Sequence, residues 1–242
     1  MPQTKPFLSV VIPMKNEEEN VAPLLDELCE ILDALASYEV IAVDDGSTDE
    51  TWRVLRDQKS RRPDHLRLVR LDRNYGQSTG FWAGLSRVRG EIVVMMDGDR
   101  QNDPHDIPKL LDELEKGADV CQTWRADRQD SGFKKLQSRI GNGVRNWLLG
   151  GSIRDTGSQL RAFRAHCLKD LPRFEGMHRF MCNLFLMRGY KIVEVPTHHR
   201  SREAGVTKYG MGNRMWRGIR DIFGMRWLAQ RTILYGVEQE DD

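Results

Sequence analysis

Hydrophobic residues in the first half of the chain form short runs that alternate with longer, helically spaced patterns. The runs predict strands at 7–12, 38–43, 66–71, 91–96 and 118–123. Between them, apolar residues three and four positions apart predict helices at 21–35, 47–62, 77–88 and 108–116. Strands that alternate with helices in this way are typical of a parallel sheet covered by helices.

The second half has a less regular pattern. We expect a helix over 133–149, a short strand over 160–163, a helix over 177–187 and a strand over 190–195. At 213–230 the pattern predicts an amphipathic helix with arginines between the residues of one apolar stripe: Met215, Trp216, Ile219, Ile222, Phe223, Trp227 and Leu228. Such a helix can pack on its own domain, lie on an anionic membrane or form a dimer contact.

Acidic residues directly follow two of the predicted strands. Asp44 and Asp45 come after the second strand, and Asp97 and Asp99, separated by Gly98, come after the fourth. Parallel strands end at the same edge of a sheet, so we expect both turns at the edge where α/β proteins bind ligands. Two carboxylates at this spacing can bind one hard cation, and the glycine lets a ligand approach closely.

The acidic turns also have purely structural interpretations. The Asp97–Asp99 turn can cap the helix that follows it. Ser47 and Glu50 have the spacing of a capping box, and Asp44 can support the same helix start. The tripeptide alone does not decide between a cation site and a turn.

Composition excludes several classes of protein. The 242 residues are 39% hydrophobic and 30% charged with a net charge of +1, which is typical of a soluble globular protein and gives no reason to expect a nucleic-acid partner. The scattered cysteines lack C-x-x-C spacing, which argues against a zinc site and predicts reduced thiols in a cytosolic protein. The start of the sequence leads us to expect no signal peptide, and the sequence shows no membrane-spanning run, G-x-G-x-x-G fingerprint or P-loop.

Five segments, in this order, resemble family 2 glycosyltransferases of the GT-A fold, and among them the dolichyl- or polyprenyl-phosphate mannosyltransferase-like branch. They lie at 9–20, 43–49, 74–84, 97–104 and 202–210. The resemblance covers about residues 7–212 and implies an α/β, Rossmann-like fold with a mostly parallel sheet flanked by helices. Residues 1–212 would form the glycosyltransferase domain, and 213–242 an amphipathic helix and an acidic tail. Gly98 departs from the alanine usual in this branch.

The resemblance also implies an activity and a set of site residues. The activity is a metal-dependent, inverting transfer of a sugar from GDP-mannose or a UDP-hexose to polyprenyl (dolichyl or undecaprenyl) phosphate. Mg²⁺ or Mn²⁺ would be bound by Asp97, Asp99 and Gln101. The nucleotide-sugar would contact Pro13, Glu17, Val43, Asp45, Asp97, Gly98, Asp99, Arg202 and Lys208. Arg125 and Arg139 would bind the acceptor phosphate, and Asp99, Asp155 and Arg202 are the candidate catalytic residues.

The acceptor decides whether a base is needed. A phosphate monoester, with a second pKa near ~6, is already a nucleophile at pH 7. A sugar hydroxyl needs a general base, for which Asp155 is the candidate. A hydroxyl acceptor on a glycan or protein is therefore an alternative function, and a non-catalytic subunit that binds nucleotide-sugar or recruits a membrane enzyme is another.

Several of these residues have structural alternatives as well. Asp155 can be a turn residue, Arg125 and Arg139 can be surface cations, and His178 can be a packed helix residue or an acceptor-side group. The paired His198 and His199 favour a structural role. We expect a cytoplasmic protein, peripheral on the cytoplasmic face of an anionic membrane, with a membrane-protein partner or a homo-oligomer as further possibilities.

Overall fold

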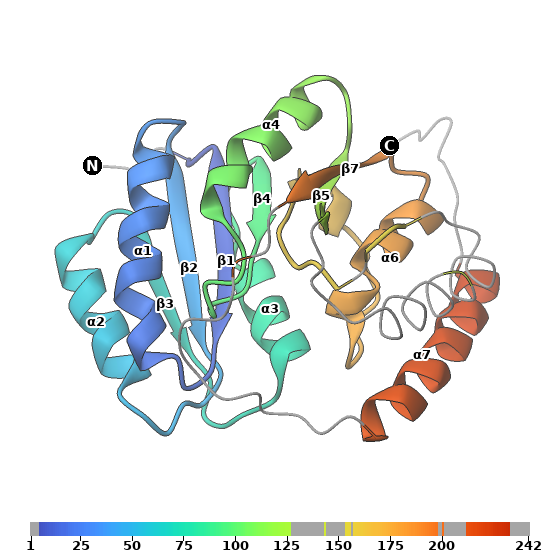
Figure 1. Ribbon diagram of the computed structural model, residues 1–242, viewed down its shortest axis with the longest axis horizontal. Coiled ribbons are helices and arrows are strands. Elements are labelled where there is room, and N and C mark those ends of the chain that lie inside the picture. The colour runs from blue at the N-terminus through green and yellow to red at the C-terminus, as the bar shows by residue number, and fades with distance from the viewer. Residues whose placement is uncertain are drawn as a thin grey trace, which may run out of the picture.

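A seven-stranded sheet forms the centre of the computed structural model, which describes residues 5–126, 143, 153–155, 157–197, 200 and 212–232 (Figure 1). The strand order is β3-β2-β1-β4-β6-β5-β7. The strands are β1 (Leu8–Met14), β2 (Tyr38–Asp44), β3 (Leu66–Arg70), β4 (Ile92–Met95), β5 (Val120–Arg125), β6 (Arg161–Arg164) and β7 (Ile192–Thr197). β6 pairs antiparallel with β4 and β5, and the other pairs are parallel. The predicted mostly parallel sheet is therefore confirmed.

Helices cover both faces of this sheet. On one face α1 (Glu18–Asp33), α2 (Thr51–Arg61) and α4 (Ile107–Glu115) pack through a core that includes Leu24, Leu55 and Leu110. On the other face α3 (Gln77–Leu85), α6 (Met181–Met187) and α7 (Gly212–Arg231) pack through a core that includes Phe81, Phe185 and Met225. Burial of each such side chain contributes about 1.5–3 kcal/mol. The short 3₁₀ helices are η1 (Pro104–Asp106), η2 (Ala165–Leu168) and η3 (Met177–Arg179).

The predicted capping box at Ser47 is wrong. α2 begins at Thr51, and no side chain caps it at Glu50. Ser47 Oγ instead accepts a hydrogen bond from the backbone N–H of Asn16, at 2.9 Å. The contact between two loops thus replaces the local one, because the chain after β1 lies beside the turn after β2.

The helix predicted over 177–187 is interrupted. η3 ends at Arg179, Phe180 has φ −111°, and α6 begins at Met181. The buried Arg161 donates a hydrogen bond from Nη1 to the carbonyl oxygen of His178, at 3.2 Å. In one continuous α-helix that oxygen would accept the N–H of the fourth residue along, so this tertiary contact competes with the helical one.

Two strands run past their predicted ends at 12 and 195, each through a proline. β1 runs through Pro13 to Met14, and β7 runs through Pro196 to Thr197. β7 lies at the edge of the sheet, where a missing backbone N–H costs no ladder hydrogen bond on the open side. Most other predicted bounds differ from the observed ones by one to three residues, as helix and strand ends often do.

Among the residues of the expected α7 stripe whose side chains the structure describes, two pack on the domain and two are exposed; the side chains of Met215, Trp216 and Ile219 lie outside the described part. Met225 is buried, and Ile222 and Leu228 pack against the core, whereas Phe223 is 61% and Trp227 60% exposed. The helix therefore packs on its own domain through one side and presents two large apolar side chains on another. Within the part of the chain that the structure describes, none of the helices combines the length and hydrophobicity needed to cross a bilayer.

Candidate active site

The carboxyl ends of the parallel strands bring the predicted site residues to one edge of the sheet. β1 pairs in parallel with both β2 and β4, so the turns after β2 and β4 lie on either side of the end of β1. β5 ends at Arg125 on the same edge, and the antiparallel β6 starts there at Arg161. The two acidic turns therefore share an edge, as the sequence predicts.

The turn after β2 fixes the turn after β3. Asp45, 3% exposed, accepts the backbone N–H groups of Tyr75 and Gly76, each at 2.8 Å. Gly46 has φ +61°, and a Cβ at this position would lie 2.3 Å from the carbonyl carbon of Arg73. Only glycine fits such a close approach. A carboxylate has about four acceptor sites, so Asp45 can still accept a hydrogen bond from a ligand.

Of the residues predicted near the end of β1, Pro13 and Val43 are buried, whereas Glu17 is accessible. Pro13 and Val43 are cross-strand partners and both are buried, so they support the edge from beneath. Glu17 is half-buried and accepts a hydrogen bond from Asn20 Nδ2 at 2.6 Å. Glu17 therefore reaches the surface of the edge, and Val43, at 0% exposure, does not.

The loop at 97–101 presents its carboxylates at this edge. Asp97 Oδ1 accepts a hydrogen bond from Gln77 Nε2 at 2.7 Å, and the backbone N–H of Asp97 donates to Asn102 Oδ1 at 3.0 Å. Asp99 Oδ1 accepts the backbone N–H of Gln101 at 3.2 Å. The side chain that caps the following helical segment is Asp103, so Asp97 and Asp99 are not its helix cap.

The donor atoms of this loop fit a divalent cation. Two carboxylates and the amide oxygen of Gln101 are the hard oxygen ligands that Mg²⁺ and Mn²⁺ prefer. Gly98 packs against β1, since a Cβ there would lie 2.8 Å from Met14 Cγ. Gly98 thus places the backbone of the loop directly over the end of the central strand.

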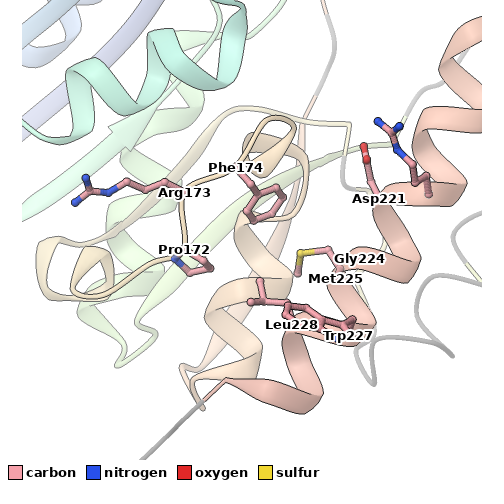
Figure 2. A pocket seen from close by; sticks show the side chains of 9 residues that line it. Pro172, Arg173, Phe174, Asp221, Gly224, Met225, Trp227 and Leu228 are labelled. Atoms are coloured by element: carbon pink, nitrogen blue, oxygen red, sulfur yellow. The ribbon is translucent and has the colours of Figure 1, made fainter.

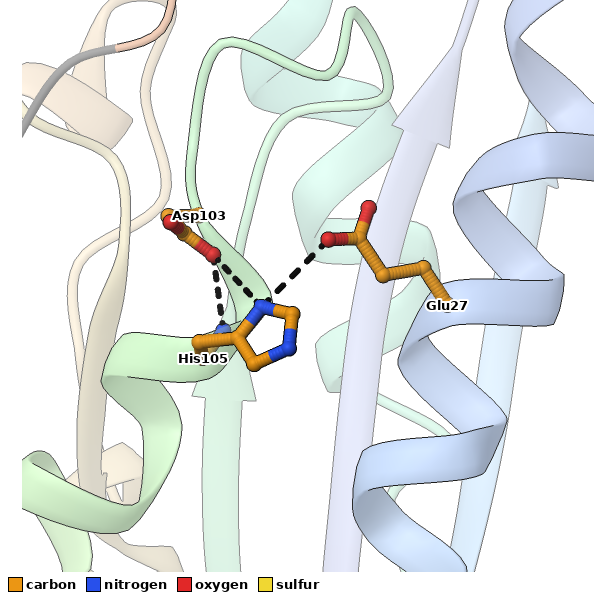
Figure 3. Close-up of side chains that lie close together, drawn as sticks. All are labelled: Glu27, Asp103 and His105. Carbon is orange, nitrogen blue, oxygen red and sulfur yellow. Dashed lines mark hydrogen bonds and ion pairs between the residues drawn. The ribbon is translucent and has the colours of Figure 1, made fainter.

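A second group of potential metal ligands lies nearby. Among the described residues, the ligand atoms of Glu27, Asp103 and His105 lie within 4.8 Å of one another (Figure 3). Arg200 already forms ion pairs with Glu27 and Asp103, each at 2.7 Å. Because a guanidinium group neutralises these carboxylates, the 97–101 loop is the better candidate for a metal.

Arg125 and Asp155 form a two-pronged ion pair. Arg125 Nε lies 2.7 Å from Asp155 Oδ2, and Nη2 lies 3.0 Å from Oδ1. Burial favours a higher pKa for Asp155, but the hydrogen bonds and charge of Arg125 outweigh burial and lower that pKa to about 2. A carboxylate with so low a pKa is a weak base, and these contacts favour a positioning role over proton abstraction.

Buried contacts hold the turn at 155–159 between β5 and β6. Arg161, 1% exposed, donates from Nη2 to the carbonyl oxygen of Ser158 at 2.7 Å. Thr123 and Ser158 share a hydrogen bond between their hydroxyl groups. Gln122 Nε2 donates to the carbonyl oxygen of Asp155 at 3.3 Å. The backbone next to the Arg125–Asp155 pair is therefore fixed from several sides.

His178 is a packed residue in this arrangement. Its Nδ1 lies 2.7 Å from Ser78 Oγ, which also accepts the backbone N–H of Gly176 at 2.7 Å. Ser78 Oγ thus contacts both η3 and the residue before it, and it holds the imidazole of His178 in place. Burial, with the nearby charges of Arg179 and Arg161, lowers the pKa of His178 to about 3.

Several residues of the site were not predicted from the sequence. Gln77 binds the side chain of Asp97, and Asn102 binds its backbone N–H. Arg200 contacts Asp103. Gln77 and Arg200 are distant from these partners in the sequence, so only the fold reveals them; Asn102 had a weak signal, as part of the 97–104 segment. Of the predicted residues, Arg139, His198, His199, Arg202 and Lys208 lie outside the described residues.

An apolar pocket lies between α7 and the segment 172–174. Its volume is about 390 Å³, and its lining includes Phe174, Met225, Trp227 and Leu228 (Figure 2). Asp221 and Arg220 of α7 also border it. Arg179 of η3 forms an ion pair with Asp221 at 2.7 Å, so η3 connects this pocket to the His178 contacts.

The solved structures that resemble this chain include a crystal structure of glucosyl-3-phosphoglycerate synthase from Mycobacterium tuberculosis in complex with Mn²⁺, uridine diphosphate and phosphoglyceric acid. Its TM-score is 0.70 at 21% sequence identity, and the match covers 96% of this chain and 81% of that chain. A likeness at this identity concerns the fold, and it confirms the expected GT-A fold.

Two known proteins are more similar in sequence. The undecaprenyl-phosphate 4-deoxy-4-formamido-L-arabinose transferase of Edwardsiella ictaluri (strain 93-146) is 37% identical over 210 residues, which cover 86% of this chain and 65% of that protein. The dodecaprenyl-phosphate galacturonate synthase of Rhizobium johnstonii (strain DSM 114642 / LMG 32736 / 3841) is 37% identical over 241 residues, covering 95% and 70%. The chain thus spans about two thirds of the length of these relatives.

The family model of glycosyl transferase family 2 matches residues 9–183, a stretch that includes all but the first residue of β1, strands β2 to β6 and the 97–101 loop. This match spans more than half of the sequence and agrees with the relatives and with the fold. The chain belongs to glycosyl transferase family 2.

Proposed function

We propose that this chain transfers a sugar from a nucleotide-sugar to a polyprenyl phosphate. The observation that carries this proposal is that one edge of the sheet presents both the 97–101 loop and the Arg125–Asp155 pair. The 97–101 loop offers ligands for a metal ion that would bind the diphosphate of the donor. The Arg125–Asp155 pair fixes an arginine that can bind the phosphate of the acceptor.

The relatives support the acceptor class more strongly than the sugar. Both relatives described above are named for a polyprenyl-phosphate carrier, undecaprenyl in one and dodecaprenyl in the other. Their sugars differ, being a formamido-arabinose and a galacturonate. Shared carrier chemistry with different sugars is the pattern expected when the acceptor side is common and the donor pocket varies. We therefore commit to the carrier and leave the sugar to experiment.

On the donor side, Glu17 and Asp45 are the carboxylates that would accept hydrogen bonds from the ribose or base. Asp97, Asp99 and Gln101 would hold Mg²⁺ or Mn²⁺, the ions present with uridine diphosphate in structures of the mycobacterial synthase. When bound, this cation would neutralise charge on the leaving diphosphate. By resemblance, Arg202 and Lys208 would add positive charge to the same diphosphate.

On the acceptor side, Arg125 would bind the lipid phosphate, and the resemblance adds Arg139. An oxygen of the phosphate monoester forms the new bond to the anomeric carbon of the sugar. The bond from that carbon to the diphosphate breaks, and the nucleoside diphosphate leaves with the electron pair. The phosphate is already ionised near pH 7, so no base is required. Asp155 then serves to orient Arg125.

The test is a transfer assay with purified protein, undecaprenyl phosphate in detergent, and GDP-mannose, UDP-glucose, UDP-N-acetylglucosamine and UDP-galacturonate as donors. Mass spectrometry would detect the glycosylated lipid phosphate. We expect product from at least one donor with Mg²⁺ or Mn²⁺, and none with EDTA or with Asp99→Ala. Product only on a hydroxyl acceptor, or metal-independent product that Asp99→Ala leaves unchanged, would contradict the proposal.

We also propose that α7 places the protein on the cytoplasmic face of an anionic membrane. The exposed Phe223 and Trp227 can enter the interface between head groups and acyl chains, and Arg220, Arg226 and Arg231 are exposed on the same helix. The apolar pocket beside Trp227 continues this surface toward the body of the domain.

Vesicle sedimentation tests this placement. We expect binding to vesicles that contain phosphatidylglycerol and weaker binding to phosphatidylcholine alone. Phe223→Ser with Trp227→Ser should abolish binding while the purified double variant stays monomeric or dimeric like the wild type. If the double variant binds vesicles normally but changes oligomeric state, α7 is a dimer contact instead.

A further inference from the structure

Arg200 is placed where it touches three parts of the molecule. Its guanidinium forks onto Glu27 of α1, with Nη1 3.0 Å from Oε2 and Nη2 2.7 Å from Oε1. The same Nη2 lies 2.7 Å from Asp103 Oδ1. Its backbone N–H donates to the carbonyl oxygen of Gln101 at 3.2 Å. One residue just after β7 thus joins a helix of the core to the end of the 97–101 loop.

Arg200 contacts an acidic cluster formed by Glu27, Asp103 and His105, whose ligand atoms lie close enough together to bind a cation. Figure 3 shows His105 between the two carboxylates, with Nδ1 3.0 Å from Asp103 Oδ1 and 3.4 Å from Glu27 Oε1. Asp103 is partly buried, and the guanidinium group of Arg200 lies 2.7 Å from both Asp103 and Glu27. The guanidinium is therefore the resident cation of this cluster.

These contacts bear directly on the loop that we assign to the metal. Gln101 and Asp103, both held by Arg200, flank Asn102. Asn102 Oδ1 in turn accepts the backbone N–H of Asp97 at 3.0 Å, so the end of the loop is hydrogen-bonded to its first residue. The position of Asp97 relative to Gln101 therefore depends on the segment that Arg200 fastens to α1.

We propose that Arg200 is a positioning residue for the metal loop: with Glu27 as its anchor on α1, it holds Gln101 and Asp103 so that Asp97, Asp99 and Gln101 converge on one ion. This inference rests on the proposed metal site. Residues that orient metal ligands typically change metal affinity by about 10- to 100-fold when they are removed. The ion pair of Arg200 with Glu27, which we call the clamp, is partly exposed. Substitution of Arg200 is therefore less harmful to folding than substitution of a fully buried arginine.

The test is calorimetric titration of Mn²⁺ into the full chain without donor, which measures affinity apart from turnover. Arg200→Gln should weaken Mn²⁺ binding about 10-fold or more, and Glu27→Gln should do the same from the other side of the clamp. Glu27→Gln also removes a ligand of the acidic cluster, so a new ion site there cannot mask the loss. Arg200→Lys should recover part of the affinity, because an ammonium keeps the charge but not the fork.

Arg62→Gln is the matched control. Arg62 forms an ion pair with Asp26, which is next to Glu27 on α1, and its other side-chain partner is Gln58 of α2. The control removes a guanidinium group that pairs with a carboxylate of the same helix, α1, without touching the metal loop. It should bind Mn²⁺ as the wild type does. Thermal unfolding of every variant shows whether the fold is retained.

The outcomes separate this inference from the function it rests on. If Asp99→Ala binds Mn²⁺ as tightly as the wild type, the proposed metal site is wrong. If Asp99→Ala loses binding while folded Arg200→Gln or Glu27→Gln binds normally, the metal site stands and the role of Arg200 is overturned. Equal weakening in Arg62→Gln would also overturn it, because the effect would then follow from the loss of any cation that pairs with α1.

Discussion

Arg125, the last residue of β5, and Asp155, thirty residues further along the chain, meet in a fork in which each carboxylate oxygen accepts one guanidinium N–H, at 2.7 and 3.0 Å. Asp155 Oδ1 also accepts the backbone N–H of Gly157 at 2.9 Å. The same carboxylate thus orients the arginine and stabilises the turn at 155–159. Asp155, a candidate base, and Arg125, a candidate phosphate ligand, thus form one ion pair.

This pair changes what substitution of Asp155 would show. Asp155→Asn keeps the shape but cannot hold Arg125 as a carboxylate does, so we expect activity to fall at least about 10-fold with a phosphate acceptor. The residual activity should keep the pH profile of the wild type, because no proton transfer has been removed. Arg154→Gln, which removes a neighbouring arginine that stacks on Trp124, is the control. A lost acid limb in the pH profile would instead identify Asp155 as a base.

The same pair predicts a stability change at acid pH. The pKa of Asp155 is lowered in the fold to about 2, from 3.8. A lowered pKa stabilises the fold above the unfolded value, and that contribution is lost as the pH falls from about 4 to 2. It amounts to about 2 kcal/mol at 1.36 kcal/mol per unit. Urea unfolding at pH 7 and pH 2.5 should show a smaller pH effect in Asp155→Asn; equal effects would contradict the ion pair.

Gln77 should contribute to metal binding through Asp97. Its amide N–H holds Asp97 Oδ1 at 2.7 Å and so orients the carboxylate. We expect Gln77→Ala to weaken Mn²⁺ binding by about 10-fold. Thr79→Ala, on the same exposed turn of α3, should leave Mn²⁺ affinity unchanged. Calorimetry of both variants decides, and parallel behaviour would show that the effect comes from the helix start and not from Gln77.

His178 should make the fold sensitive to mildly acid pH. The pKa of His178 is lowered to about 3 from 6.5, so the unfolded chain takes up a proton that the folded chain does not. Stability is therefore complete above pH 6.5 and falls as the pH is lowered toward 3, with about 2 kcal/mol lost by pH 5. His178→Gln should remove this part of the pH dependence of urea unfolding. If the wild type and His178→Gln lose the same stability on acidification, His178 is protonated in the folded state.

Gly46 should be the least replaceable of two left-handed glycines. Gly46 and Gly117 have φ of +61° and +94°, so alanine strains both by about 1–2 kcal/mol. A Cβ at Gly46 would also meet the Arg73 backbone at 2.3 Å, whereas Gly117 has nothing within 4 Å. Gly46→Ala should therefore lower the free energy of unfolding by at least about 2 kcal/mol more than Gly117→Ala. Equal losses would show that the two loops can separate without cost.

Local patterns predicted the half of the fold that local rules determine. Strands β1 to β4 are short apolar runs between amphipathic helices, and parallel pairing then places Asp45 and Asp97 at one edge without further information. The same reasoning could not place β6 between β4 and β5, because an antiparallel insertion depends on pairing across the chain.

The failures have one physical cause, which is competition from distant partners. Ser47 has the spacing of a helix cap, but Asn16, thirty-one residues earlier, takes its hydroxyl. The helix expected over 177–187 breaks where Arg161 takes the carbonyl oxygen of His178. Gln77 and Arg200 have no local pattern that indicates a role, and each becomes informative only when the fold places it on the 97–101 loop.

The most direct test of the account is calorimetric titration of nucleotide-sugars into the wild type and Asp99→Ala, each with and without Mn²⁺. We predict that the wild type binds at least one of GDP-mannose, UDP-glucose, UDP-N-acetylglucosamine and UDP-galacturonate only when Mn²⁺ is present. Asp99→Ala, folded as judged by thermal unfolding, should bind none of them. Donor binding that needs neither the metal nor Asp99 would contradict the assignment of the 97–101 loop as the donor site.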